Sequence, residues 1–198
     1  MEKNAVNRIL SESDKLINSK GYDLHKEYER IIELAQFESK ATIYDFACGS
    51  GRGASILLGN GFQVKAFDFN ETQFIKAKQR LTNEQLKRIE FIKMDLENIE
   101  YEDNSIDNIV CLNTIHEVEN PIRIINEIFR VYSGKGKLVV CDFNKVGFDL
   151  MDIVHEIIYN DNHNLGKMNQ NQFEEFLTNK KISYKAFETE LNWVKIIG

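Results

Sequence analysis

Apolar positions in the first forty residues recur at helical spacing, which predicts two amphipathic helices. Their apolar faces comprise Val6, Ile9, Leu10, Leu16 and Ile17 in the first helix, and Tyr28, Ile31, Ile32 and Ala35 in the second. From residue 41 onward, short apolar runs alternate with further amphipathic segments. The runs that we expect to be strands are 41–46, 62–67, 89–94, 106–112, 137–143, 182–187 and 193–197.

Helix signals occupy the intervals between these runs. Residues 54–58 continue from the first run as a helix that ends at the turn Gly59-Asn60-Gly61. Asn70, with Gln73 three residues later, predicts a capping box, and Asn120-Pro121 predicts a helix start. The apolar residues that we expect to face inward from the later helices are Phe74, Ala77, Leu81, Ile122, Ile125, Ile128, Phe129, Met151, Val154, Ile157, Ile158, Phe173, Phe176 and Leu177.

Strands that alternate with helices in this way form βα units, which predict a parallel sheet covered on both faces. The last two runs lie close enough to form a hairpin, which reverses the final strand. The expected fold is therefore α/β, a doubly wound, Rossmann-like and mostly parallel seven-stranded sheet with a reversed last strand. We expect one domain over 1–198, made of N-terminal helices (1–40), a core (41–143), a helical insertion (144–180) and a terminal β-hairpin (181–198).

Composition and charge narrow the classes of partner. Hydrophobic residues make up 42% of the 198 residues and charged residues 28%, which is ordinary for a globular domain. The net charge is −6, from 31 acids against 25 bases, and no basic cluster offsets it, so no nucleic-acid partner is expected. No apolar run approaches the ~20 residues of a membrane span. The sequence predicts no particular oligomeric state.

Three cysteines occur, Cys48, Cys111 and Cys141, and no two have the short spacing of a metal-binding or disulfide pair. Each lies in an apolar, strand-like context, so we expect three buried thiols that act as small hydrophobes. The first twenty residues lack the apolar core of a signal peptide. A reducing, cytoplasmic location is the expectation.

A glycine-rich loop follows the first predicted strand. Gly49 and Gly51 permit positive φ, and the helix that starts near Gly53 presents free N–H groups to an anionic ligand. Residues 49–54 satisfy the dinucleotide pattern G-x-G-x-x-G/A, so NAD binding is one interpretation. A tight strand-to-helix turn without a ligand is another.

Acidic residues at three successive strand ends favour a different ligand. Asp45 lies in the apolar strand just before the glycines, where a carboxylate would repel a pyrophosphate and attract an ammonium or sulfonium group. Asp68 ends the second strand, the position from which a carboxylate accepts hydrogen bonds from a ribose diol. Asp95 follows the third strand and would lie further along the same groove.

The run from Ile43 to Gly51 resembles the first motif of class I S-adenosylmethionine-dependent methyltransferases, especially the small-molecule enzymes related to quinone biosynthesis. The segments 66–70 and 94–96 resemble the motifs whose acids hold ribose and adenine. Residues 105–110 resemble the fourth-strand motif, and 115–118 with Asn120-Pro121 resemble the segment that closes over the methyl donor. The resemblance implies S-adenosylmethionine as cofactor, held by Asp45, Ala47, Gly49, Gly51, Asp68, Phe69, Asp95, Leu96 and Asn113.

Two residues depart from the pattern of the family. Ala47 stands where the family usually has glycine, which would cost on the order of 1 kcal/mol if this position needs positive φ. Glu117 stands where close relatives often carry a second histidine, so the acceptor is not inferred from them. The family places acceptor specificity in the N-terminal helices, which could act as a lid, and in the insertion 144–180.

Residues that could act on the acceptor follow the fourth and fifth strands. His116 is the candidate catalytic base, and a packing or capping role is the alternative. Asn113 could contact the methionine moiety, and Asp142 could face the acceptor. His155 and His163 flank Asp161, but their spacing matches no helical ligand pair, so a solvated loop is favoured and no metal is expected. Apolar residues that could line an acceptor pocket, or belong to the core, are Tyr22, Tyr28, Met151, Ile157 and Tyr159.

The expected function is S-adenosylmethionine-dependent methyl transfer to a small-molecule acceptor. One alternative is an NAD-linked oxidoreductase. Asp45, the reversed last strand and the lack of a Tyr-Lys or metal site for hydride transfer argue against it. A second alternative is a non-catalytic protein that binds S-adenosylmethionine.

Overall fold

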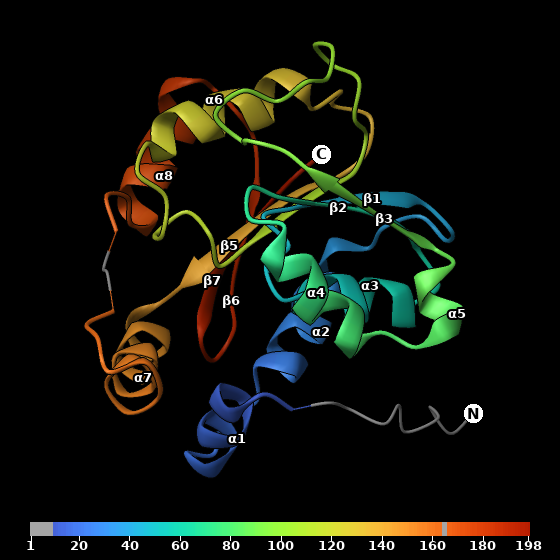
Figure 1. The fold of residues 1–198 in the computed structure, drawn as a ribbon. Helices are drawn as coiled ribbons and strands as arrows, with labels where there is room; N and C mark the ends of the chain where they lie inside the picture. The colour runs from blue at the N-terminus through green and yellow to red at the C-terminus, as the bar shows by residue number, and fades with distance from the viewer. Residues whose placement is uncertain (1–9, 164–165) are drawn as a thin grey trace.

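Seven strands form one sheet in a computed structural model that describes residues 10–163 and 166–198 (Figure 1). The strands are β1 (Thr42–Phe46), β2 (Gln63–Asp68), β3 (Ile89–Lys93), β4 (Ile109–Leu112), β5 (Leu138–Phe143), β6 (Lys185–Glu188) and β7 (Asn192–Ile197). Their order across the sheet is β3-β2-β1-β4-β5-β7-β6. The first five are mutually parallel, and β7 is antiparallel to both of its neighbours, as predicted.

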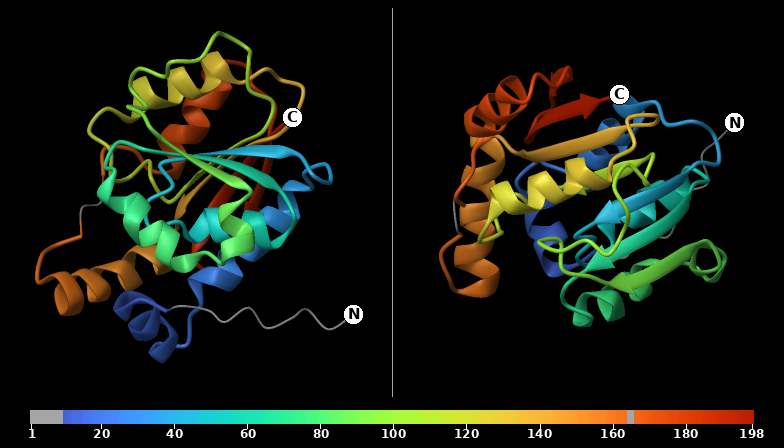
Figure 2. Two further views of the ribbon diagram at one scale, coloured as in Figure 1. Left: turned by 45° about the vertical axis from the view of Figure 1, so that its right-hand side comes forward. Right: turned by 90° about the horizontal axis from the view of Figure 1, so that it is seen from above.

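Helices cover both faces of the sheet (Figures 1 and 2). One face carries α2 (Leu24–Ala35), α3 (Arg52–Gly59), α4 (Thr72–Arg80) and the short α5 (Asn83–Leu86), and the other carries α6 (Pro121–Val131) and α8 (Gln170–Asn179). Helices α1 (Glu12–Ser19) and α7 (Lys145–Val154) contact each other beyond the sheet, and α7 continues into the π-helix η1 (His155–Tyr159). None of the described helices is long and apolar enough to cross a membrane.

The apolar residues form a core on each face of the sheet and a third, smaller cluster. The two large cores pack β-strand residues such as Phe46 and Phe67 against α6 and α8, and Ile43 and Val110 against α2 and α3. The small cluster joins α1, α2 and α7 at the end of β5 and includes Ile17, Leu24, Phe143, Leu150, Val154 and Leu191. Cys48, Cys111 and Cys141 are all buried, as predicted.

Several local predictions were wrong for identifiable reasons. The predicted capping box of Asn70 does not form: the Asn70 side chain accepts from the Thr72 backbone N–H at 3.0 Å, and the helix begins at Thr72. Ile122 is 49% exposed, because 100° per residue places it about 120° from the centre of the buried stripe. Ile124 is buried in its place.

The remaining differences concern the ends of elements. The fourth strand begins at Ile109 rather than at 106, with Ile106 in an isolated bridge to Tyr132. Ile157 is exposed because the wider turn of the π-helix shifts the helical phase set by Met151 and Val154. Helix α5 was not predicted, although Thr82 and Gln85 form a capping box at its start. The predicted helical residues Val6 and Ile9 lie outside the described residues.

Candidate functional site

A cavity of about 1110 Å³ opens at the carboxyl ends of the parallel strands, where doubly wound sheets bind ligands. Its volume slightly exceeds the usual range for small-molecule sites, which is ~300–1,000 Å³. Gly51 does not line the cavity. The predicted cofactor residues that line it are Asp45, Ala47, Gly49, Asp68, Phe69, Asp95, Leu96 and Asn113.

The glycine loop between β1 and α3 is built by close packing. Gly51 has φ +77°, and a Cβ there would lie 2.7 Å from the Ala77 Cβ, so only glycine lets α3 and α4 approach. A Cβ on Gly53 would lie 3.0 Å from Leu112 and 3.3 Å from Asp45 Oδ2. Gly51 therefore allows the loop to pack closely against α4 behind the cavity wall, while Gly49 lines the cavity itself.

Ala47 adopts φ +57°, the left-handed conformation that its family position suggested. A Cβ in this region costs roughly 1–2 kcal/mol relative to glycine, before the entropy of the unfolded chain is counted. The residue lines the cavity directly after β1. The chain thus carries a local strain where its backbone turns into the site.

Asp45 lies on β1 with its carboxylate buried below the glycine loop. The side chain is 2% exposed, and its Oδ2 has no hydrogen-bond partner among the described residues. Burial, and then the charge of Asp68, raise the pKa of Asp45 to about 7, while a bond from the Ala54 backbone N–H opposes the shift. A buried carboxylate with a free oxygen fits a cationic ligand, which would stabilise its ionised form.

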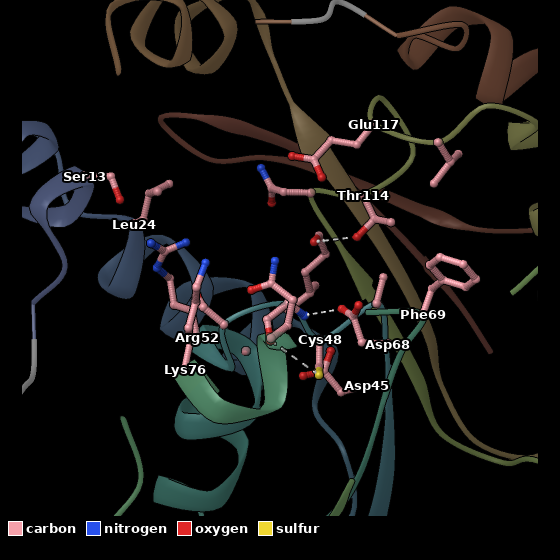
Figure 3. A pocket seen from close by; sticks show the side chains of 18 of the residues that line it. Ser13, Leu24, Asp45, Cys48, Arg52, Asp68, Phe69, Lys76, Thr114 and Glu117 are labelled. Carbon is pink, nitrogen blue, oxygen red and sulfur yellow. Dashed lines mark hydrogen bonds between the residues drawn. The ribbon is translucent and has the colours of Figure 1, made fainter. Parts of the chain in front are cut away.

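Asp68 ends β2 and holds the glycine loop in place (Figure 3). Its Oδ2 accepts the Gly49 backbone N–H at 2.8 Å, and its Oδ1 accepts the Asn70 N–H at 2.9 Å. Because a carboxylate has about four lone-pair sites, Asp68 retains acceptor capacity for a diol. Phe69, which follows it, is 72% exposed at the cavity wall.

Asp95 and Leu96 follow β3 in the same line of strand ends. Asp95 Oδ1 accepts the Glu97 backbone N–H at 2.8 Å, which shapes the turn after β3. Leu96 is 7% exposed and packs in the core while still reaching the cavity. Because the sheet order is β3-β2-β1-β4, the residues Asp95, Asp68, Gly49 and Asn113 lie in sequence along one edge.

His116 lies behind the cavity wall rather than in it. Its side chain is 1% exposed, its Nδ1 lies 2.5 Å from Asp142 Oδ1, and its backbone N–H donates to Asp142 Oδ2 at 2.9 Å. Burial alone would lower the pKa of His116, but the bonds with Asp142 and Glu117 outweigh it and raise this pKa to about 9. A catalytic role of His116 remains a prediction, and such a role would have to act through a neighbour.

The neighbour is Glu117, which does line the cavity (Figure 3). Its Oε1 lies 3.6 Å from His116 Nε2, and its side chain is 66% exposed. Partial desolvation beside the protein would raise the pKa of Glu117, but the hydrogen bond and charge of His116 outweigh it and lower this pKa. The carboxylate is therefore ionised where it meets the cavity.

Two expectations on this side of the site were wrong. Asp142 does not face an acceptor, because its oxygens are taken by His116 and by the Phe143 backbone N–H at 2.8 Å. His163 is not in a solvated loop: its side chain is 2% exposed, and its Nε2 lies 3.3 Å from His116 Nε2. The ring of His155 lies 4.6 Å from that of His163. Among the described residues, no group of side chains is arranged to hold a metal ion.

The sequence indicated a role for the N-terminal helices only through the family resemblance, and no residue of α1 was predicted to line the site. Ser11, Glu12, Ser13 and Ile17 line the cavity opposite the glycine loop. Asp14, which is 3% exposed, joins this helix to α3 and α4 by accepting from Arg52 at 2.6 Å and from Arg80 at 3.2 Å. The S-x-x-D spacing of Ser11 and Asp14 forms a capping box, the one local signal that could have located this helix start.

Comparisons with known proteins agree with this geometry. Residues 44–140 match the family described as a methyltransferase domain. A demethylmenaquinone methyltransferase from Clavibacter sepedonicus is 29% identical over 102 residues, which are 52% of this chain and 41% of that protein. The ubiquinone/menaquinone biosynthesis C-methyltransferase UbiE of Hydrogenovibrio crunogenus is 28% identical over 130 residues, 63% of this chain and 51% of that protein. The chain thus spans about half the length of the curated relatives it matches.

A solved structure supports the fold over nearly the whole chain. The crystal structure of a SAM-dependent methyltransferase from Aquifex aeolicus superposes with a TM-score of 0.64 at 18% identity, covering 96% of this chain and 100% of that one. The comparisons give no support to the NAD-linked alternative. From the family match, the related sequences and the strand-end motifs together, the chain belongs to the class I S-adenosylmethionine-dependent methyltransferase family and is similar to its members of quinone biosynthesis.

Proposed function

We propose that this chain binds S-adenosylmethionine along the strand ends and transfers its methyl group to a small apolar acceptor in the same cavity. The observation that carries the proposal is the buried carboxylate of Asp45, which has an unpartnered oxygen beneath the glycine loop. Such a group fits a ligand that brings positive charge, as the ammonium and sulfonium of the cofactor do. The cofactor, when bound, supplies an already activated methyl group.

The remaining cofactor residues take roles that follow their order along the sheet. Asp68 would accept from the ribose hydroxyls, Asp95 and the Leu96 backbone N–H would meet adenine, and Phe69 would cover the nucleoside from the exposed side. Asn113, at the end of β4, would meet the methionine portion. The line β3-β2-β1-β4 matches the order adenine, ribose, sulfur and amino acid in the cofactor.

The acceptor side of the cavity is lined mainly by apolar residues from α1, α2, β5, α7 and η1. Glu117 brings an ionised carboxylate to this side, and the buried Asp142–His116 pair supports it from behind. Because the methyl group of the cofactor is already activated, a protein group that aligns the methyl acceptor by accepting a hydrogen bond from it is sufficient. The apolar lining residues are Ile17, Leu24, Phe143, Met151, Ile158 and Tyr159.

The names of the curated relatives place them in menaquinone and ubiquinone biosynthesis, which agrees with an apolar acceptor. We place the reaction in the cytoplasm, in keeping with three free, buried cysteines. The division into a single domain with an N-terminal lid, a cofactor core, an acceptor-side insertion and a terminal hairpin is part of the same proposal.

Calorimetric titration with S-adenosylmethionine and with NAD tests the cofactor, and an incubation with methyl-labelled S-adenosylmethionine and a metabolite extract tests the transfer. We expect S-adenosylmethionine to bind more tightly and label to appear in an extractable small molecule. The Asp45→Asn variant, which keeps the shape and removes the charge, should bind the cofactor more weakly. Tighter binding of NAD would overturn the proposal, and cofactor binding without transfer would favour a non-catalytic binder.

A further inference from the structure

Asn192, on β7, does not reach the cavity, yet it lies in a buried chain of polar side chains that does. Its side chain is 0% exposed and its Oδ1 accepts the Asn113 Nδ2–H at 2.7 Å. Its Nδ2 donates to Glu27 Oε2 at 3.0 Å. Glu27, from α2, and Asn192 are 165 residues apart in the sequence. These hydrogen-bonded side chains therefore link an N-terminal helix, the last strand and the wall of the site.

The direction of each hydrogen bond between Glu27, Asn192 and Asn113 follows from Glu27, which accepts the first of them. Glu27 Oε2 also accepts from the Leu191 backbone N–H at 2.9 Å and from the Thr189 hydroxyl at 2.5 Å. A carboxylate oxygen has no hydrogen to donate, so Asn192 must present its NH₂ group to it. The carbonyl oxygen of Asn192 then faces Asn113, so Asn113 must present an N–H to it.

Asn113 itself is held in an uncommon conformation. Its φ is +49°, which asparagine tolerates better than other non-glycine residues. Besides the bond to Asn192, its backbone N–H donates to the Cys141 carbonyl at 3.0 Å, and its Oδ1 accepts from the Cys141 thiol at 3.4 Å. Side-chain bonds on both ends of the amide thus fix the turn that follows β4, and this turn leads into Thr114 and Glu117 at the cavity.

We propose that Asn192, oriented by Glu27, is a positioning residue for the methionine-binding part of the cofactor site, acting through Asn113. The inference rests on the proposed function, which places the amino-acid portion of S-adenosylmethionine at Asn113. Asn192 acts at a distance: it holds the left-handed turn after β4 and the rotamer of the Asn113 amide. In the proposed binding mode the nucleoside portion lies over β2 and β3, which are on the opposite side of β1 from β4. Its binding therefore does not depend on the hydrogen bonds between Glu27, Asn192 and Asn113.

Two ligands distinguish binding of the amino-acid portion from binding of the nucleoside portion. S-adenosylhomocysteine carries both the nucleoside and the amino acid, whereas 5′-methylthioadenosine carries the nucleoside and sulfur alone. In Asn192→Ala, we expect the dissociation constant of S-adenosylhomocysteine to rise about five- to thirtyfold, because Asn113 loses its acceptor. The dissociation constant of 5′-methylthioadenosine should change by less than about twofold. A purely structural role would weaken both ligands alike.

Thr189→Val is the matched control. Thr189 bonds to the same Glu27 oxygen and to the Asn192 backbone, but it makes no bond to Asn113. We expect this variant to lower the melting temperature while the ratio of the two dissociation constants stays as in the unaltered chain. Should Asn192→Ala fail to fold, Asn192→Ser keeps a polar group in the buried site, is too short to reach Asn113, and should change the ratio in the same direction.

An unchanged ratio in the Asn192 variant that folds would overturn the inference, and so would an equal change of the ratio in Thr189→Val. Failure of the proposed function looks different. In that case the unaltered chain would bind neither ligand, and the inference would fall with it. Calorimetry with both ligands on the three chains reads out each of these outcomes without requiring a methyl acceptor.

Discussion

The two sides of the cavity are built in different ways. On the side that we propose to hold the cofactor, called the cofactor side, Asp45, Asp68 and Asp95 follow one another along the chain, and each is placed by the strand that carries it. On the side that we propose for the acceptor, called the acceptor side, the wall is held by pairs of side chains that are distant in sequence. His116 meets Asp142 across 26 residues, and Arg52 meets Asp14 across 38. One side depends on backbone geometry, and the other depends on buried charge pairs.

The difference has a consequence for stability. Strand-end residues keep their place as long as the sheet is intact, because backbone hydrogen bonds hold them. A buried charge pair, in contrast, becomes strongly destabilising when one partner is removed or loses its charge. We therefore expect the acceptor side to respond to pH and to single substitutions far from the cofactor, and the cofactor side to respond through affinity.

The largest effect should come from the His116–Asp142 pair. Because the pKa of His116 is raised from 6.5 to about 9, the pair contributes its full stability below pH 6.5 and loses it as the pH rises through about 9. A shift of this size corresponds to about 3 kcal/mol in the free energy of unfolding. Urea unfolding across this pH range should show the loss in the unaltered chain and a much smaller one in His116→Gln.

The other titratable groups that face His116 are Glu117 and His163, and burial together with the charges of His116 and His155 lowers the pKa of His163. Lys185→Gln, in the exposed part of β6 away from this cluster, is the control and should keep the pH dependence of the unaltered chain. A His116→Gln variant with an undiminished loss of stability at high pH would show that the charge pair does not support the acceptor side.

Asp68→Ala should have the next largest effect. We expect it mainly in the affinity for S-adenosylmethionine rather than in the free energy of unfolding. In the proposed site the variant would lose the bonds to a bound ribose, and it also releases the Gly49 and Asn70 backbone N–H groups. Charge-assisted hydrogen bonds of this kind contribute roughly 1.5–3 kcal/mol, so the dissociation constant of S-adenosylmethionine should rise about ten- to 150-fold. Calorimetry measures it directly. Glu71→Ala, an exposed acid outside the cavity, should leave the affinity unaltered; equal affinities for Asp68→Ala and the unaltered chain would remove Asp68 from the site.

The contrast between the two sides also explains what the sequence could predict. The seven strands, their mostly parallel arrangement, the reversed last strand and the positions of Asp45, Asp68 and Asp95 follow from local periodicity and from residues at the ends of strands. The burial of His163 and the contact of Asp14 with Arg52 do not follow from local patterns. They depend on how α1 and the residues after η1 pack against elements that are far away in the sequence. Asp142 was misplaced for the same reason: its strand end was recognised, but the histidine that takes its oxygens was not.

Asp14 offers an intermediate test on the acceptor side. The charge of Arg52 and the bonds from Ser11 outweigh burial and hold the pKa of Asp14 well below its usual range, so its contribution is lost only as the pH falls below about 4. Asp14→Asn should weaken the docking of α1 by about 1–2 kcal/mol, since one acceptor oxygen is retained. Hydrogen exchange at the Leu16 and Ile17 amides should then accelerate about five- to thirtyfold.

Glu12→Gln changes an exposed acid of the same helix and should leave that exchange unchanged. If α1 exchanges equally fast in Asp14→Asn and in the unaltered chain, the Asp14–Arg52 contact does not hold the helix over the cavity. The acceptor wall would then be closed by apolar contacts of Ile17 and Leu24 alone.

The smallest effect should appear on the cofactor side, at Ala47. Glycine adopts φ +57° without a steric cost, so Ala47→Gly gains roughly 1–2 kcal/mol in the folded state. It also loses roughly 0.4–1 kcal/mol through the greater freedom of the unfolded chain. We therefore expect a net stabilisation of no more than about 1.5 kcal/mol in urea unfolding. Ala186→Gly, in the exposed part of β6, is the matched substitution at ordinary strand geometry and should destabilise by roughly 0.5–1 kcal/mol. Opposite signs at the two alanines would show that the turn into the site is strained, whereas destabilisation at both would mean that the left-handed turn of Ala47 carries no net cost.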